Sequence, residues 1–280
     1  MRNQLDARQF VRELAPALRQ AASIARALEG RVANRPKRDE ATAVKAALTV
    51  ADIACQEALL VPLFECFPEV RLAAEEDTPS VARFPQVSDH TVVIDPIDGT
   101  LHFYLEDRGP YAVMLGLAER GEYEAGLVAL PRERLFFSAV RGQGGLIARG
   151  DSPPRRTCLD ADGDRIYISH DLPEDAADFL REKGFEPVPA SGGAISVAPL
   201  VPGVRAGLRL MRSTPSVSIR GRVGALVSAE AGALLQDETG APFPVHMDAR
   251  ARALLVATND ADLTLLHDAL GIALVTEGSG

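Results

Sequence analysis

A run of β-branched residues that ends in two aspartates places the strongest constraint on how this chain folds. The segment TVVIDPIDGT covers residues 91–100, and Asp95 and Asp98 stand three positions apart near its end. Four consecutive β-branched residues favour a buried strand. Carboxylates at the end of a buried strand are costly to desolvate unless a cation or hydrogen bonds compensate them. The segment therefore predicts a strand that brings acidic ligands to the edge of a sheet.

Two more acidic residues are expected at the same edge. Asp52 lies in TVADIACQ, and Glu75 lies in LAAEED. We expect the strands RLAAE and VVID to lie side by side and to end together, so that Glu75 and Asp95 meet. We expect Pro96 to turn the chain and carry Asp98 back to them, because proline fixes φ and favours turns.

Oxygen ligands of this kind suit Mg²⁺, which prefers octahedral oxygen coordination. Asp95 has two oxygens with which to bridge two ions, and the Ile97 carbonyl would face the same pocket. The Thr100 hydroxyl, oriented by a carboxylate, would accept and relay a proton from a water that a metal has made more acidic. The pattern predicts metal-assisted hydrolysis, most naturally of a phosphate ester. For Asp98 alone, capping of the following turn or helix is the better interpretation.

Length and charge narrow the class of protein. The 280 residues are 46% hydrophobic and 25% charged, with a net charge of −9, which fits one large or two modest globular domains. The Pro- and Arg-rich segment GDSPPRRT suggests a division into an N-terminal α+β region, 1–152, and a C-terminal α/β region, 153–280. The negative charge argues against binding to nucleic acid or to an anionic membrane. Because the first residues also lack the continuous apolar core of a signal peptide, we expect a cytoplasmic protein.

The remaining pattern is typical of a layered α/β fold. We expect helices over 5–29 and 41–66, three or four antiparallel strands within 111–150, and alternating strands and helices beyond 153. The GQGG segment lies between two strands and is interpreted as a hairpin turn rather than a phosphate-binding loop. The three cysteines form no CxxC pair, and the two on the second helix lie too far apart for a disulfide.

Several segments together resemble the inositol monophosphatase family, the Mg²⁺-dependent, lithium-sensitive phosphatases. They are DPIDGT, LTVADIACQEAL, AAEED, GLVALPRERLFFSAVRGQGG and SAEAGALLQDETGAPF. The intervals agree as well, since Asp52 precedes Glu75 by 23 positions and Glu75 precedes Asp95 by 20. The resemblance implies a layered α-β-α-β-α fold, a homodimer, and a small phosphorylated substrate such as an inositol or sugar phosphate.

The resemblance also implies a role for each matching residue. Metal ligands would be Glu75, Asp95, the Ile97 carbonyl and Asp98. Water activation would rest on Asp52, Glu75 and Thr100. Substrate contacts would come from Asp98, Gly99, Thr100 and, in a departure from the family pattern, Arg220.

The departure concerns the second metal site. The family carries a tryptophan–aspartate pair where this chain has Arg220, ten positions before Glu230; the chain has no tryptophan, and no Asp or Glu lies between Glu186 and Glu230. The same stretch holds five arginines, and VRAGLRL replaces the acidic residues with which the family grips its substrate. One interpretation is that Arg220 takes the place of the second metal, pairs with Asp98 or Asp95, and supplies charge to the phosphate. The other is a family member without catalysis that binds phosphate or serves as a scaffold; a structural salt bridge from Arg220 to Asp98 is compatible with either.

Overall fold

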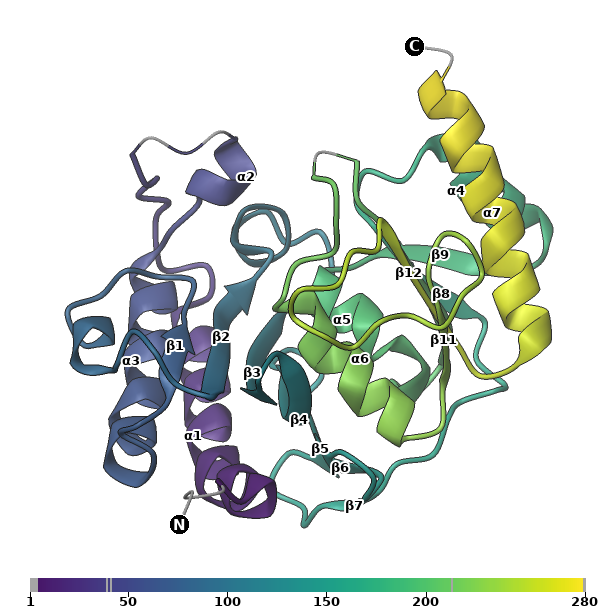
Figure 1. The fold of residues 1–280 in the computed structure, drawn as a ribbon. Helices are drawn as coiled ribbons and strands as arrows, with labels where there is room; N and C mark the ends of the chain where they lie inside the picture. Colours follow the sequence, from purple (N-terminus) through teal and green to yellow (C-terminus); the bar gives the residue numbers. More distant parts are fainter. Residues whose placement is uncertain (1–4, 39, 41, 213, 279–280) are drawn as a thin grey trace.

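A computed structural model describes the chain except for residues 1–4, 39, 41, 213 and 279–280. Two sheets are each covered by helices on both faces (Figure 1). The helices α1 and α3 cover the outer face of the first sheet, α5 and α6 lie between the two sheets, and α4 and α7 cover the outer face of the second. This confirms the predicted layered α-β-α-β-α arrangement.

The first sheet has seven strands in the order β1-β2-β3-β4-β5-β6-β7. Its strands are β1 (Arg71–Ala73), β2 (His90–Asp98), β3 (Ala112–Glu119), β4 (Glu122–Leu130), β5 (Leu135–Val140), β6 (Gly145–Arg149) and β7 (Arg155–Arg156). Strand β1 runs parallel to β2, and every later neighbour is antiparallel. Side chains alternate between the two faces, so that Val92 and Ile94 pack under α1 and α3 while Val93 faces α5 and α6.

The second sheet has five strands in the order β11-β12-β10-β8-β9. They are β8 (Arg165–Ile168), β9 (Glu186–Pro189), β10 (Val204–Leu210), β11 (Leu234–Gln236) and β12 (Ala253–Ala257). The helices are α1 (Ala7–Leu28), α2 (Ala43–Ala46), α3 (Val50–Cys66), α4 (Glu174–Glu182), α5 (Gly192–Ser196), α6 (Gly221–Glu230) and α7 (Asp260–Gly278), with short turns η1 (Val81–Arg83), η2 (Thr100–Leu105) and η3 (Ala198–Leu200). None of the helices in the described part of the chain is long and apolar enough to cross a membrane.

The predicted elements agree with this arrangement except in two places. The helix expected over 41–66 is divided, because Thr49 caps a new helix that begins at Val50. Strands β9 and β10 were not predicted, although β10 lies at the centre of the second sheet. The division at 152/153 remains a prediction; α5 and α6 come from the C-terminal half and pack against strands of both sheets.

Glycines allow α6 to approach the first sheet closely. A side-chain Cβ added at Gly116 would lie 2.6 Å from Cγ2 of Val223, and one at Gly126 would lie 2.9 Å from the Val223 carbonyl oxygen. The GQGG segment is the turn between β5 and β6, as predicted. It holds the Glu230 carboxylate at the end of α6, which accepts hydrogen bonds of 2.8, 3.0 and 2.9 Å from three successive backbone N–H groups, 142–144. These contacts fix α6, and thus the residue before it, Arg220.

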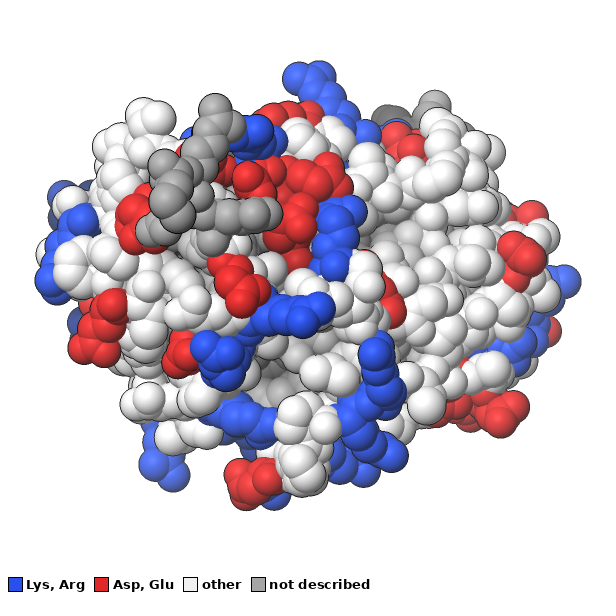
Figure 2. Space-filling model, turned by 60° about the horizontal axis from the view of Figure 1, so that its bottom comes forward, with Lys and Arg blue, Asp and Glu red and all other residues white. Residues whose placement is uncertain are grey.

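Charge is distributed unevenly on the surface. On the face shown in Figure 2, acidic side chains gather in one area and basic side chains lie beside and below it. The net charge of −9 is therefore not spread evenly over this face.

Candidate active site

The carboxylates meet where β1 and β2 end. The two strands pair in parallel with Ala73 opposite Val93, so continuing the register places Glu75 opposite Asp95. The predicted turn at Pro96 was wrong, because β2 continues to Asp98 and its pairing with β3 shifts between Asp95 and Asp98. A bulge of this kind re-aims side chains without ending the strand.

Asp95 is the most constrained of these residues. It is 3% exposed, and its Oδ1 is buried without a hydrogen-bond partner in the described part of the chain. Burial raises the pKa of Asp95 well above its usual range, and the negative charges of Glu75 and Asp98 raise it further, while Arg220 lowers it. A buried carboxylate oxygen with no partner is costly in an apolar surrounding. The position is thus prepared for a cation.

Asp52 and Thr100 form a buried relay beside this group. Thr100 Oγ1 lies 2.9 Å from Asp52 Oδ1 and 2.9 Å from the Ile97 carbonyl oxygen. The other oxygen of Asp52 accepts bonds of 2.7 Å from both the backbone N–H and the hydroxyl of Thr49, which completes a capping box at the start of α3. Burial raises the pKa of Asp52, while the hydrogen bonds from Thr49 and Thr100 oppose that shift.

The turn that follows β2 positions Thr100. Gly99 has φ +85°, and a Cβ there would lie 2.5 Å from the Phe103 ring, so glycine suits this position sterically. The next six residues form η2, a single π-helical stretch, and such stretches occur often at functional sites.

Arg220 forms its ion pair with Glu75, a different carboxylate from Asp98 and Asp95, the two that were expected. Its Nε lies 3.8 Å from Oε2 of Glu75, and it donates to the backbone carbonyls of Ile94 at 3.2 Å and Ala74 at 3.1 Å. The predicted ion pair with Asp98 is not formed in the described structure. Asp98 Oδ2 instead accepts a 2.5 Å hydrogen bond from the backbone N–H of Gly193. Arg220 therefore joins the ends of β1 and β2 beside the metal-ligand candidates.

A cavity of about 230 Å³ opens over this cluster. Glu75, Asp98, Gly99 and Thr100 line one part of it. The rest of the wall contains basic and imidazole side chains, which are His102, His170, Arg209 and Arg212. One cavity thus combines acidic and basic walls.

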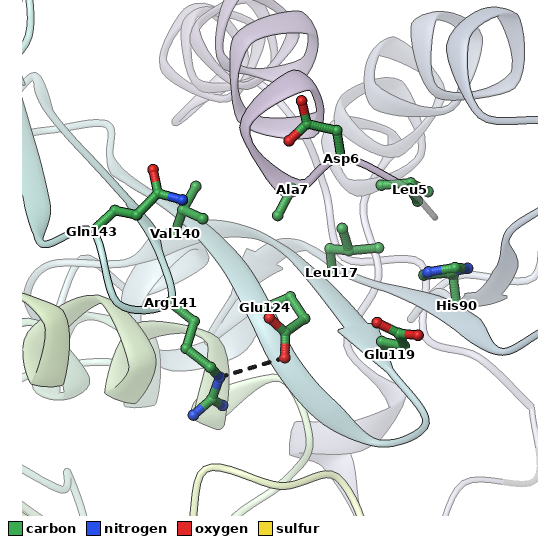
Figure 3. Close-up of a pocket in the computed structure, with 10 residues that line it drawn as sticks. All are labelled: Leu5, Asp6, Ala7, His90, Leu117, Glu119, Glu124, Val140, Arg141 and Gln143. Carbon is green, nitrogen blue, oxygen red and sulfur yellow. Dashed lines mark ion pairs between the residues drawn. The ribbon is translucent and has the colours of Figure 1, made fainter. Parts of the chain in front are cut away.

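A second hollow, of about 340 Å³, lies elsewhere on the first sheet, beside the start of α1 (Figure 3). Arg141 forms an ion pair of 3.5 Å with Glu124 on its floor. It contains none of the predicted site residues, and we do not assign it to the active site.

The donor set fits Mg²⁺ in chemistry, because it consists of carboxylate and carbonyl oxygens. The unpartnered Oδ1 of Asp95 supports the fit, and the Ile97 carbonyl keeps a second lone pair beside its bond from Thr100. Within the described residues, however, no three His, Cys, Asp or Glu side chains are already gathered as a metal-binding group. Glu75 Oε2 lies 3.8 Å from Nε of Arg220, so an ion bound here would share this carboxylate with the arginine.

Comparison with known proteins decides the family. The model of the inositol monophosphatase family matches residues 8–169, more than half of the chain. The chain belongs to the inositol monophosphatase family. This confirms the family that the DPIDGT segment indicated.

Individual relatives of known identity match only part of the chain. Human inositol monophosphatase 2 is 36% identical over 98 residues, which are 35% of this chain and 33% of that protein. The Nus factor SuhB of Pasteurella multocida is 33% identical over 100 residues, 36% of each chain. The 3'(2'),5'-bisphosphate nucleotidase CysQ of Escherichia coli is 30% identical over 99 residues, 34% of this chain and 38% of that one. The chain therefore spans about a third of the length of each relative it matches.

Solved structures extend the likeness of the fold to nearly the whole chain. The Thermotoga maritima inositol monophosphatase superposes with a TM-score of 0.70 over 92% of this chain and 96% of its own, at 18% identity. An enzyme described as an inositol monophosphatase/NADP phosphatase, complexed with Mg²⁺ and phosphate, gives 0.66 over 93% and 94%, also at 18% identity. At this identity the likeness establishes the fold of the family.

Two positioning groups escaped sequence reasoning. The Gln56 side chain of α3 donates to the Glu76 carbonyl at 2.7 Å and accepts from the Glu76 N–H at 3.0 Å, which holds the segment that carries Glu75. Gly193, which holds Asp98, lies 95 positions away in the chain. Gln56 could have been predicted, because it lies one helical turn after Asp52 on the same face of the helix. No local sequence pattern predicts the role of Gly193.

Proposed function

We propose that this protein is a Mg²⁺-dependent phosphomonoesterase that hydrolyses a small phosphorylated metabolite. The observation that carries the proposal is the 2.9 Å hydrogen bond from Thr100 to Asp52, at the wall of a cavity that also holds Glu75 and Asp98. The family match supports phosphatase chemistry, and the relative complexed with Mg²⁺ and phosphate supports the metal.

In the proposed mechanism, Glu75, Asp95, the Ile97 carbonyl and Asp98 hold Mg²⁺. The ion, when bound, supplies positive charge to the phosphoryl oxygens and makes the attacking water more acidic. The Thr100 hydroxyl takes a proton from that water while it gives its own to Asp52 Oδ1. The water oxygen then bonds to phosphorus as the ester oxygen leaves, and a solvent proton neutralises the leaving oxygen.

Arg220 contributes fixed charge in this proposal. Because it lies against Glu75 and lowers the pKa of Asp95, it offsets the repulsion among the carboxylates, and we infer that it replaces part of the second metal site. In this proposal the Gly99 backbone and Asp98 line the part of the cavity where the substrate binds. We also retain as proposals a homodimer, a cytoplasmic location, and no binding to nucleic acid or membrane.

A second candidate function is phosphate or metabolite binding without turnover. The ion pair between Arg220 and Glu75 favours this function, because the arginine is paired with a carboxylate that the proposed mechanism needs as a metal ligand.

Phosphate release separates the two functions. We expect purified protein with Mg²⁺ to release phosphate from at least one sugar, inositol or nucleotide monophosphate, and to lose this activity with a chelator. The variant Asp95→Asn keeps the shape of the side chain, and its activity should fall by about 10²-fold or more, as expected when an essential catalytic contact is lost. Binding of inorganic phosphate without any turnover across the panel would establish the second function instead.

A further inference from the structure

Arg209 lines the active-site cavity together with the carboxylates. It belongs to β10, the central strand of the second sheet, and it lines the same cavity as Glu75 and Asp98. Metal-ligand candidates and an arginine from a different sheet therefore border one space of about 230 Å³.

The guanidinium of Arg209 fits a space that two glycines leave open. A Cβ at Gly192 would lie 2.1 Å from its Cζ, and a Cβ at Gly221 would lie 2.1 Å from its Nη1. Any larger residue at either position would displace the guanidinium. The first residues of α5 and α6 thus hold its head group in a defined place.

The head group has a buried donor without a partner. Nη1 of Arg209 is buried and makes no hydrogen bond to the described residues. Two other arginines of the same stretch have acidic partners, since Arg205 pairs with Asp262 at 2.7 Å and Arg220 contacts Glu75. The buried Arg222 has an unpartnered Nε as well, but its other nitrogens donate to backbone carbonyls. Leaving a charged group without a compensating partner costs more than leaving a neutral one. Arg209 is only partly buried and lines the cavity, so an anion bound there would offset the charge of its guanidinium.

We propose that Arg209 binds a second anionic group of the substrate, a phosphate or a carboxylate, separate from the phosphoryl group that is hydrolysed. This rests on the proposed function. The carboxylates, with the metal that they would hold, take the reacting phosphoryl group, and the arginine recognises another anion in the same cavity through its planar pair of donors. Arg212 and His102 on the same cavity wall add to the attraction for an anion. A neutral polyol phosphate gains nothing from Arg209.

The test compares substrates that differ in the second group. Wild type and Arg209→Met are assayed with Mg²⁺ on fructose 1,6-bisphosphate, on 3-phosphoglycerate and on the neutral ester glycerol 2-phosphate. The variant should lower kcat/KM for an ester with a second anion by about 10- to 100-fold, the size of a lost hydrogen bond to a charged group. The ratio of kcat/KM for the anionic ester to that for the neutral ester should fall accordingly, whatever general effect the variant has on both. The bisphosphate and the carboxylate identify which anion is preferred, and Arg155→Met, at an exposed arginine of β7, is the matched control.

A binding measurement keeps the test independent of turnover. Without Mg²⁺, calorimetry with fructose 1,6-bisphosphate should show weaker binding to Arg209→Met than to wild type, and thermal unfolding should show that the variant is folded. Equal binding, together with an unchanged ratio of kcat/KM values, would overturn the role of Arg209 and leave the phosphatase function intact. No turnover by wild type on any ester would reject the phosphatase function, while the binding difference would still decide the role of Arg209.

Discussion

Arg220 lies 3.8 Å from Glu75 and donates to the carbonyls of Ala74 and Ile94, so one guanidinium links the ends of two parallel strands at the site. It supplies positive charge at a position where the family resemblance predicts an acidic metal ligand. The carboxylates of Glu75 and Asp95 are neighbours of like charge. Something positive must stabilise them in the folded protein, and in this structure that group is Arg220.

Removal of this charge should make the fold depend more strongly on Mg²⁺. We expect Arg220→Gln to lower stability by about 1–3 kcal/mol, because a charged hydrogen bond to the strand ends is lost. Added Mg²⁺ should then raise the Tm of the variant more than that of wild type, since the ion replaces the missing charge. Thermal unfolding with and without Mg²⁺ measures both effects, with Arg155→Gln as the control. Equal Mg²⁺ shifts in the two proteins would contradict this compensation.

The Thr100 hydroxyl should be required for turnover, and its methyl group should not. Thr100→Val keeps the shape but removes the group that links water to Asp52, so kcat should fall by about 10²- to 10⁴-fold, the range of general acid–base contributions. Thr100→Ser keeps the hydroxyl and should retain most activity. Phosphate release on the best substrate of the panel measures both variants. If the valine variant were as active as the serine variant, the relay would be wrong.

How far the sequence predicts this site depends on whether the contacts are local. The strand at 91–95 and its neighbour at 71–73 were predictable, because β-branched runs that end in carboxylates leave few alternatives. The course of the chain at Pro96 was not, since a bulge and a turn suit proline equally well. The partner of Arg220 depends on where α6 docks against the first sheet, chiefly on β4 and β5. That docking is fixed by long-range contacts such as those of Glu230, which no local pattern reveals.

The missed strand β10 has a physical explanation as well. All residues of VRAGLRL are buried except the two arginines, which are partly buried, as expected for a central strand covered on both faces. Gly207 weakens the strand propensity, and two arginines suggest a solvent-exposed segment. In the structure one of them pairs with Asp262 and the other, Arg209, lines the cavity. Tertiary partners thus override the local preference.

Glu230 should contribute to stability through three backbone hydrogen bonds. Its carboxylate accepts from the N–H groups of residues 142–144. We expect Glu230→Ala to lower the free energy of unfolding by about 1–3 kcal/mol, because these donors lose a charged acceptor. Glu174→Ala, at an exposed glutamate of α4, should change it little. Chemical denaturation measures both, and equal losses would contradict the role of this contact.

The cysteines should differ in reactivity. Cys55 is buried, its thiol lies 3.2 Å from the Ala21 carbonyl oxygen, and burial raises its pKa to about 12. Cys66 and Cys158 are exposed. Because the thiolate is the reactive form, a thiol reagent should label these two in the native protein and label Cys55 only after denaturation. Equal labelling of Cys55 and Cys158 at native pH would show that α1 and α3 open readily.

His170 should make the fold sensitive to mild acid. Its ring stacks against His102 with centroids 4.2 Å apart, and burial lowers its pKa, with His102 and Arg108 adding to that shift and Asp171 opposing it. The unfolded chain therefore takes up a proton at this histidine below about pH 6.5, whereas the folded protein takes it up only at a lower pH. Stability from this residue is thus complete above that pH and is lost as the pH falls.

We expect His170→Gln to reduce the acid dependence of stability. Between about pH 7 and pH 5, the Tm of the variant should fall less than that of wild type, because the proton uptake specific to the unfolded state is removed. Carboxylates with raised pKa values, such as Asp52, change stability with pH in the opposite direction, because their folded forms take up protons first as the pH falls. These carboxylates are the same in wild type and variant. The difference between the two curves of Tm against pH therefore reports His170 alone. His246→Gln, outside this cavity, shows the effect of removing a histidine elsewhere. Parallel curves for wild type and His170→Gln would mean that the imidazole pair carries no such linkage.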